Sequence, residues 1–249
     1  MSKTIGSVST MTLNLTDPIK MTIEKMSFNQ LCILVGQNGT GKTLVLKINW
    51  CMAMISNTII GAKLMNIPSD NIKNAQYIFD KSFDDQNFNG TIEVHYENAT
   101  LSITFDSGIV KNVNMEHDED ITPNAPPIFM SKETRTFDSY IHYMKLKKVF
   151  KIEGEMIKMS EEQIEKLLVM YKLYDILFME MMLNKLENYS VPQTLVDHFK
   201  ELGITKPIDQ IVIDNDICDI SVISEGTKIN IVTFGAGEQS MINMMLAAS

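Results

Sequence analysis

The residues with the clearest chemistry form one glycine-rich octapeptide. They match the pattern G-x-x-x-x-G-K-[ST] and are Gly36, Gln37, Asn38, Gly39, Thr40, Gly41, Lys42 and Thr43. Glycines permit backbone conformations in which successive N–H groups turn toward one anion. Lys42 adds a positive charge for the β- and γ-phosphates and is the candidate catalytic residue, and the Thr43 hydroxyl is suited to Mg²⁺. The spacing therefore predicts a site for a nucleoside triphosphate and magnesium.

The segments on both sides of this loop are of the kind that could position it. The run Leu31–Val35 is continuously apolar and ends at a glycine, which predicts a buried strand. An apolar segment from about Thr43 to Met65 predicts a long helix after the loop. The positive N-terminal end of that helix would face the same phosphates. A strand, a loop and a helix in this order are the context that the motif requires.

Composition limits the classes of protein that the chain can belong to. With 249 residues, of which 45% are hydrophobic and 21% charged, it is expected to fold around a sizeable core. The formal net charge of −9 argues against general electrostatic binding to nucleic acid. A local basic patch could still contact nucleic acid. Arg135 is the single arginine in the sequence, so phosphate chemistry must depend on lysine, backbone amides and metal.

Cysteine usage and the start of the sequence favour a cytoplasmic protein. Cys32, Cys51 and Cys218 are widely spaced and form no C-x-x-C pair, so neither a disulfide framework nor a zinc site is expected. The first residues lack the apolar core of a signal peptide. Polar residues interrupt the longest apolar stretch, Leu44–Ala62, so no membrane span is expected.

Alternating apolar and polar residues predict several antiparallel strands. The pairs Met11–Leu15 and Lys20–Lys25 predict a hairpin. A meander is predicted over Thr91–Tyr96, Leu101–Phe105 and Ile109–Val113. Further strands are expected at Ile128–Met130, Ile211–Ile213, Asp219–Ser224 and Lys228–Thr233, with a hairpin turn at Glu225 and Gly226. Residues 66–85 give mixed signals.

Two helices are expected between the meander and the closing strands. Ser160 and Gln163 have the spacing of a capping box, which predicts a helix start, and the apolar pattern continues to about Asn188. Val191–Leu202 predicts a second helix. Together they suggest a helical subdomain inserted at 150–205 in a single domain that spans residues 1–249.

The loop, with Gln37, Asn38 and Gly39 at its centre, resembles the G-x-N-G-x-G-K-[ST] loop of ABC/AAA-type P-loop ATPases. The likeness is strongest to the branch with the SMC, RecF and OLD-family proteins. A second segment, F-G-A-G-E-Q at residues 234–239, resembles the L-S-G-G-E-Q signature of that family. Its residues Gly235, Ala236, Gly237 and Glu238 precede an apolar segment, Met241–Ala248, as the family's signature precedes a helix.

The resemblance implies an α/β fold, the P-loop NTPase head of an ABC-type ATPase. Such a head has a mixed central sheet, an antiparallel β lobe that covers the adenine, and a helical insertion. It implies binding of ATP and Mg²⁺ and ATP-gated dimerisation, in which the signature of one subunit closes over the γ-phosphate held by its partner. The partner would be a second copy or another ATPase or nuclease subunit. DNA repair and maintenance, or defence against phage, are the settings it suggests.

Three features depart from the family pattern or need separate weighing. Gly235 replaces the signature serine, which leaves Thr233 and Ser240 as the nearest hydroxyls. Family members carry a Walker B strand ending in Asp-Glu after the signature helix, and the sequence ends before such a strand, so an incomplete head is expected. Earlier runs ending at Asp80, Asp106 and Asp214 lack the adjacent glutamate and are better explained as turn or strand-end residues.

The sequence permits two interpretations of Arg135. It follows the expected strand at Ile128–Met130, where this family often places a polar residue that senses nucleotide or the dimer partner. It could equally be a surface ion-pair residue.

Two other functions compete with an ATP-gated ATPase. The first is a nucleotide-binding regulatory module with little or no hydrolysis, favoured by Gly235 and the missing Walker B strand. The second is a P-loop kinase or GTPase, which the absence of an N-K-x-D motif disfavours. Hydrolysis by this chain alone is therefore left open, and it would require a Walker B element from beyond residue 249 or from a partner.

Overall fold

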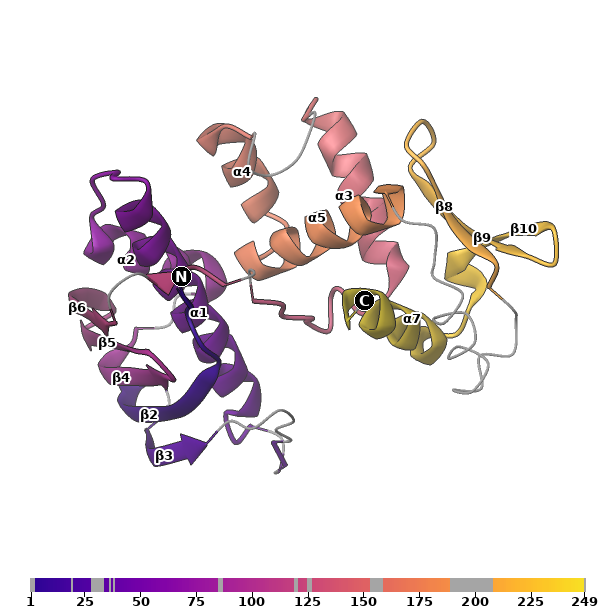
Figure 1. The fold of residues 1–249 in the computed structure, drawn as a ribbon. Coiled ribbons are helices and arrows are strands. Elements are labelled where there is room, and N and C mark those ends of the chain that lie inside the picture. Colours follow the sequence, from indigo (N-terminus) through magenta and orange to yellow (C-terminus); the bar gives the residue numbers. More distant parts are fainter. Residues whose placement is uncertain are drawn as a thin grey trace. The chain divides into compact units, whose positions relative to one another are not determined.

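The computed structural model describes residues 3–18, 20–27, 34–35, 37, 39–84, 87–118, 121–124, 127–152, 159–188 and 208–248. The chain divides into two compact units, Met1–Pro127 and Ile128–Ser249, called here the N-terminal and the C-terminal unit. Each unit combines helices with antiparallel strands, so the protein is a mixed α/β protein (Figure 1). The single domain with a helical insertion at 150–205 stays a prediction.

The N-terminal unit is built on a five-stranded antiparallel sheet with the order β3-β2-β4-β5-β6. Its strands are β2 (Val8–Asp17), β3 (Met21–Ser27), β4 (Asn89–Tyr96), β5 (Ala99–Asp106) and β6 (Ile109–His117). Buried residues alternate with more exposed ones along β4 and β5, because one face of the sheet packs inward. The predicted N-terminal hairpin and the predicted meander are confirmed. A short parallel pair joins β1 (Lys3–Thr4) to β7 (Ile121–Thr122).

Two helices accompany this sheet. The helix α1 (Lys42–Leu64) begins directly after the glycine-rich loop, as predicted. The segment with mixed sequence signals contains α2 (Asn71–Ser82), which contacts both α1 and β6. Its start is fixed by Asp70, whose side chain accepts a hydrogen bond from the Lys73 N–H at 3.1 Å. An aromatic cluster joins α2 to the sheet and consists of Phe79, Phe83, Phe88 and Phe105.

The helix α1 is the core helix of the N-terminal unit. Its buried residues include Ile48, Cys51, Met52 and Ile55, none of which is measurably exposed. Among the described helices, α1 alone is long and apolar enough to cross a membrane, but 61% of its most apolar window is buried inside the structure. Such burial is typical of a helix that packs in the core of a soluble protein.

The C-terminal unit contains four helices and a three-stranded antiparallel sheet among its described residues. The helices are α3 (Phe137–Val149), α4 (Glu161–Leu168), α5 (Leu173–Asn188) and α7 (Ala236–Ala248). The sheet has the order β10-β9-β8, with β8 (Gln210–Asp214), β9 (Asp219–Ser224) and β10 (Thr227–Asn230). The predicted turn is confirmed, since Glu225 and Gly226 both have positive φ angles, of 49° and 74°. The core is formed by apolar residues of α3, α5, α7 and the sheet.

Several sequence predictions for this unit need correction. The capping box of Ser160 and Gln163 is present, but the helix that it starts ends at Leu168, and α5 is a separate helix. The last strand ends at Asn230, because the Asn230 side chain accepts from the Val232 N–H at 3.0 Å and starts a 3-10 turn, η2 (Ile231–Thr233). Residues 128–130 form no strand, and Ile128 is 51% exposed. The helix predicted at 191–202 lies outside the described residues.

Candidate functional site

The glycine-rich loop has a backbone that only glycine adopts easily at two positions. Gly39 and Gly41 have φ angles of 82° and 81°, in the left-handed region. A β-carbon on Gly41 would also lie 2.3 Å from Cε of Met21, on β3. Gly41 therefore combines a conformational requirement with close packing. Gly36 and Asn38 lie outside the described residues.

Lys42 and Thr40 are held by the same backbone carbonyl. Lys42 Nζ donates to the Gln37 oxygen at 2.6 Å, and Thr40 Oγ1 donates to that oxygen at 2.8 Å. Lys42 is half-buried, while Thr43, the second residue of α1, is exposed. The loop therefore closes on itself around Gln37 and keeps an ammonium group and a hydroxyl at the start of a helix.

The start of α1 is electrostatically positive. The first helical hydrogen bond runs from the Val45 N–H to the Gly41 oxygen, so the amides of residues 42–44 have no partner within the helix. The first turn contains no acidic residue, and among the described residues no side chain caps it. Lys42 and the helix dipole thus add charge of one sign, an arrangement that can hold a phosphate.

The segment before the loop, where a strand is predicted, lies mostly outside the described residues. Residues 31–33 and Gly36 lie outside the described residues. Leu34 and Val35 are in no regular element, and Val35 is 89% exposed. The prediction of a buried strand is therefore wrong at Val35.

The signature-like segment lies in the C-terminal unit and opens α7. Gly235 stands directly before the helix, and Ala236, Gly237 and Glu238 form its first turn. The Glu238 carboxylate accepts a hydrogen bond from the Gly235 N–H through Oε2 at 2.8 Å. The helix start is therefore capped by its own acidic side chain, as the acidic half of a capping box does. The Thr233 hydroxyl donates to the Asn230 carbonyl at 2.8 Å, so it is engaged locally.

Two buried amide side chains on α7 hold a neighbouring turn, Ser131–Thr136, called here the Arg135 turn. Gln239 accepts from the Phe137 N–H at 2.8 Å and donates to the Phe234 carbonyl, also at 2.8 Å. One turn later on the same helix, Asn243 donates to the Arg135 carbonyl at 2.9 Å and to the Thr134 carbonyl at 3.4 Å. The tertiary structure therefore brings the signature-like segment and Arg135 together.

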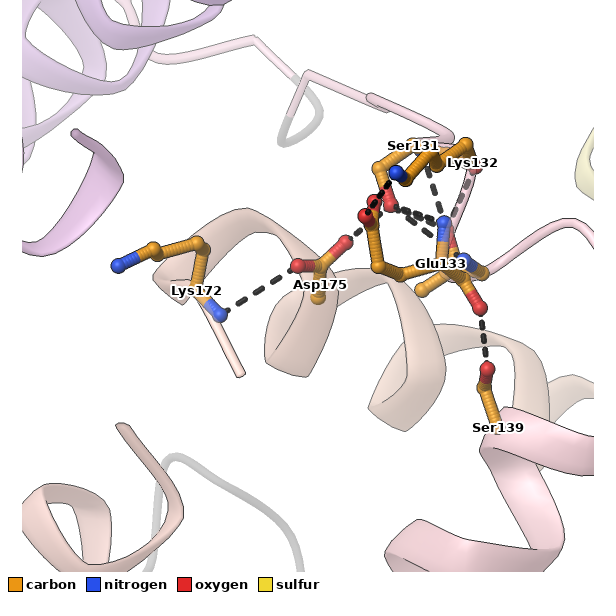
Figure 2. A network of polar contacts seen from close by, with 7 residues as sticks. Ser131, Lys132, Glu133, Ser139, Lys172 and Asp175 are labelled. Atoms are coloured by element: carbon orange, nitrogen blue, oxygen red, sulfur yellow. Dashed lines mark hydrogen bonds and ion pairs between the residues drawn. The ribbon is translucent and has the colours of Figure 1, made fainter. Parts of the chain in front are cut away.

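The other side of the Arg135 turn is held by α5. Ser131 Oγ donates to Asp175 Oδ1 at 2.5 Å and accepts from the Glu133 and Thr134 N–H groups (Figure 2). Asp175 Oδ2 accepts from the Lys172 N–H at 3.3 Å, which caps the start of α5. Asp175 is only 2% exposed. Burial of the Tyr171 hydroxyl and, to a smaller extent, the charge of Asp175 raise the pKa of Tyr171 to about 12. Asp175 and Ser131 belong to no sequence motif, so this contact could not be predicted from local patterns.

Arg135 itself is exposed. Among the residues that the structure describes, its guanidinium makes no ion pair, so the surface ion-pair reading gains no support. The described surroundings fix its backbone and leave its side chain at the surface.

The aspartates considered as Walker B candidates have local structural roles. Asp214 ends β8 and accepts from the Asp216 and Ile217 N–H groups within the following turn. Asp106 ends β5 and accepts from Ser107 Oγ, while Asp80 lies on α2 and accepts from Gln76 Nε2. Within the described part of the chain, no group of three or more His, Cys, Asp or Glu side chains could hold a metal ion.

No protein-family model matches the sequence, and no curated protein matches it. The chemistry of the site accordingly rests on its own residues.

Proposed function

We propose that this chain is an ATP-binding domain of the ABC type with a P-loop NTPase fold, in which residues 36–43 bind the phosphates of ATP. The observation that carries the proposal is the start of α1, where left-handed Gly39 and Gly41, the backbone amides of the first helical turn and Lys42 converge without any acidic residue in that turn. This combination of donors and positive charge suits a triphosphate.

The residues of the loop would have separate roles in binding. Lys42 would exchange the Gln37 carbonyl for a phosphate oxygen, and the amides that follow Gly41 would donate to the same anion. The exposed Thr43 hydroxyl is a hard oxygen ligand that fits Mg²⁺, whose chemistry is to neutralise charge on the β- and γ-phosphates. The same donors fit the triphosphate of ATP and of GTP, so preference for the base is a question for the titration.

The test of binding is a calorimetric titration of the full chain with Mg-ATP and with Mg-GTP. Lys42→Ala should weaken ATP binding about 100-fold, because a charge-assisted contact worth about 3 kcal/mol is lost. Lys73→Ala is the matched control, since the Lys73 side chain is 84% exposed on α2 and pairs only with Asp70 among the described residues. Equal affinities of Lys42→Ala and the unchanged chain would overturn the proposal, and preference for GTP would revive the GTPase alternative.

The proposal includes ATP-gated association with a second ATPase head, either another copy or an ATPase or nuclease subunit. Gly235, Ala236 and Gly237 are exposed at the start of α7, and Arg135 is exposed on the turn that α7 holds. Such a surface could close over a phosphate presented by a partner. Light scattering with and without Mg-ATP measures this directly, and a mass that stays monomeric at saturating Mg-ATP would remove the self-association part of the proposal.

A regulatory module with little or no hydrolysis is the second candidate. It is favoured by the local hydrogen bonds of Asp80, Asp106 and Asp214, which leave the described residues without a Walker B pair. The steady-state rate of phosphate release from Mg-ATP separates the two candidates. A rate that Lys42→Ala abolishes would identify an ATPase, whereas binding without turnover would identify the module.

The biological setting proposed for this domain is DNA repair and maintenance or defence against phage, in the cytoplasm. This part rests on the resemblance of the two motifs to the SMC, RecF and OLD-family branch. Because the net charge is −9, contact with DNA would depend on a local basic surface or a separate subunit. Addition of duplex DNA to the titration, at low and at physiological salt, tests whether the chain itself binds nucleic acid.

A further inference from the structure

Buried polar side chains in this protein are concentrated around one short turn. Nine polar residues of the described chain are buried, and five of them surround the Arg135 turn or belong to it: Ser131, Thr134, Asp175, Gln239 and Asn243. Burying polar groups is unfavourable unless each gains a partner, so such a concentration usually fixes a particular backbone geometry. The geometry fixed here is that of the segment that carries Arg135.

The turn is held from two sides by different helices. From α5, Asp175 accepts from Ser131 Oγ, which in turn accepts two backbone N–H groups of the turn (Figure 2). From α7, Asn243 donates to the carbonyls of Thr134 and Arg135, and Gln239 accepts from the Phe137 N–H just beyond the turn. These contacts reach the backbone and leave the Arg135 side chain exposed.

The contribution of Asn243 to stability does not explain an asparagine at this position. The residue is fully buried, and among the described residues its Oδ1 has no hydrogen-bond partner. A buried acceptor without a partner is destabilising, and an apolar side chain of similar volume would avoid that penalty. What Asn243 provides in return is a fixed link between α7 and the carbonyl of Arg135.

We infer that Asn243 and Gln239 are positioning residues that couple the signature-like segment to Arg135, so that both meet a nucleotide-loaded partner as one rigid surface. The inference rests on the proposed function, since it assigns Arg135 to the ATP-gated contact between chains. It adds two residues, Gln239 and Asn243, that act through Arg135 and through the start of α7 and that touch neither nucleotide nor partner themselves.

The experiment is a double-mutant cycle on self-association of the full chain, measured by light scattering in saturating Mg-ATP. Arg135→Ala and Asn243→Leu should each weaken association about tenfold. The double variant should associate as strongly as Asn243→Leu alone, because an Arg135 side chain that is no longer positioned does not contribute to association. Losses that multiply in the double variant, or no loss in Arg135→Ala, would overturn the inference.

A control variant separates positioning from loss of stability. Tyr143→Phe removes a hydrogen bond of 2.6 Å to Glu180, which links α3 to α5 away from the Arg135 turn. It should lower the melting temperature as a buried polar deletion does and leave Mg-ATP association unchanged. Association weakened to the same degree by Tyr143→Phe and by Asn243→Leu would show that stability alone is responsible.

Two further readouts keep the outcomes distinct. Should Asn243→Leu fail to fold, Ser131→Ala takes its place in the cycle, since it loosens the same turn from the α5 side. Mg-ATP affinity of the monomer is measured for every variant and should stay constant. A chain that binds no ATP refutes the proposed function, whereas normal ATP binding with an Arg135-independent dimer refutes the inference alone. Normal ATP binding without any dimer refutes the inference together with the self-association part of the proposed function.

Discussion

Two helices of this protein begin at glycine-rich segments, and their starts are built in opposite ways. At α1, Gly41 has a φ angle of 81°, no side chain caps the helix and no acidic residue lies in the first turn. At α7, the Glu238 carboxylate caps the Gly235 N–H, and the Gln239 side chain accepts from the Phe137 N–H and donates to the Phe234 carbonyl. The positive end of α1 therefore remains available for an external anion, whereas the Glu238 carboxylate neutralises part of the positive end of α7.

The contrast shows that glycine content does not define an anion site. The surroundings of the helix amides decide whether they can take an external charge, and an acidic side chain in the first turn competes for them. The α1 start has the backbone geometry and positive charge on which the proposed phosphate site rests. The α7 start has those of a surface whose position is controlled by neighbouring helices.

The largest expected effect tests how firmly the α7 segment is anchored. Gln239→Leu leaves the buried Phe137 N–H and Phe234 carbonyl without their partner, and it should cost about 3 kcal/mol of the free energy of unfolding. Gln37→Leu changes an exposed side chain of the glycine-rich loop and should alter the free energy of unfolding by less than about 0.5 kcal/mol. Urea denaturation measures both, and similar losses would erase the distinction between the two segments.

A pair of glycine substitutions tests the backbone of each start. Gly41→Ala should cost about 2 kcal/mol and weaken Mg-ATP binding, because the left-handed φ angle opposes a β-carbon, whereas the nearby Cε of Met21 ends a flexible side chain and can move aside. Gly237→Ala has open space around it and should stabilise α7 by up to about 1 kcal/mol. Thermal unfolding and a Mg-ATP titration provide the measurements. Tolerance of Gly41→Ala in both would contradict the loop geometry described here.

Alkaline pH should affect the core behind the α1 start. Burial raises the pKa of Cys51 from 9.0 to about 12, so the folded state keeps a proton that the unfolded state loses above pH 9. Stability from this thiol is complete below pH 9 and falls as the pH rises to about 12, with a loss on the order of 1 kcal/mol at pH 10. Cys51→Ala should reduce the slope of unfolding free energy against pH in that interval. An unchanged slope would show that Cys51 ionises with equal ease in both states.

The smallest effect concerns the acidic cap of α7. Glu238→Ala removes the acceptor for the Gly235 N–H and a favourable charge near the helix dipole, at a cost of about 0.7 kcal/mol. Glu238→Gln keeps an acceptor and should lose less.

The converse change places an acidic residue at the start of α1. Thr43→Glu should prevent Mg-ATP binding while the fold persists. Unimpaired binding by Thr43→Glu would show that the start of α1 is not the phosphate site.

Local sequence patterns predicted many of the elements. Period-two alternation placed the N-terminal hairpin, the meander and the closing strands, because each has one buried face. The capping box located the start of α4 from two residues alone. Prediction was wrong where nonlocal contacts decide. An apolar run continued across the break between α4 and α5, where the Asp175 carboxylate accepts from the Lys172 N–H and starts a new helix.

The sequence by itself determined the chemistry available to the glycine-rich loop. Its glycines, lysine and threonine are consecutive, and each acts through the backbone or through its nearest neighbours. Only the tertiary structure decided that Arg135 belongs beside the signature-like segment. Residues 131–137 and 239–243 are about a hundred positions apart, and they meet through buried amide hydrogen bonds from Gln239 and Asn243. Such bonds have no sequence period, because their partners are backbone groups that every residue type carries.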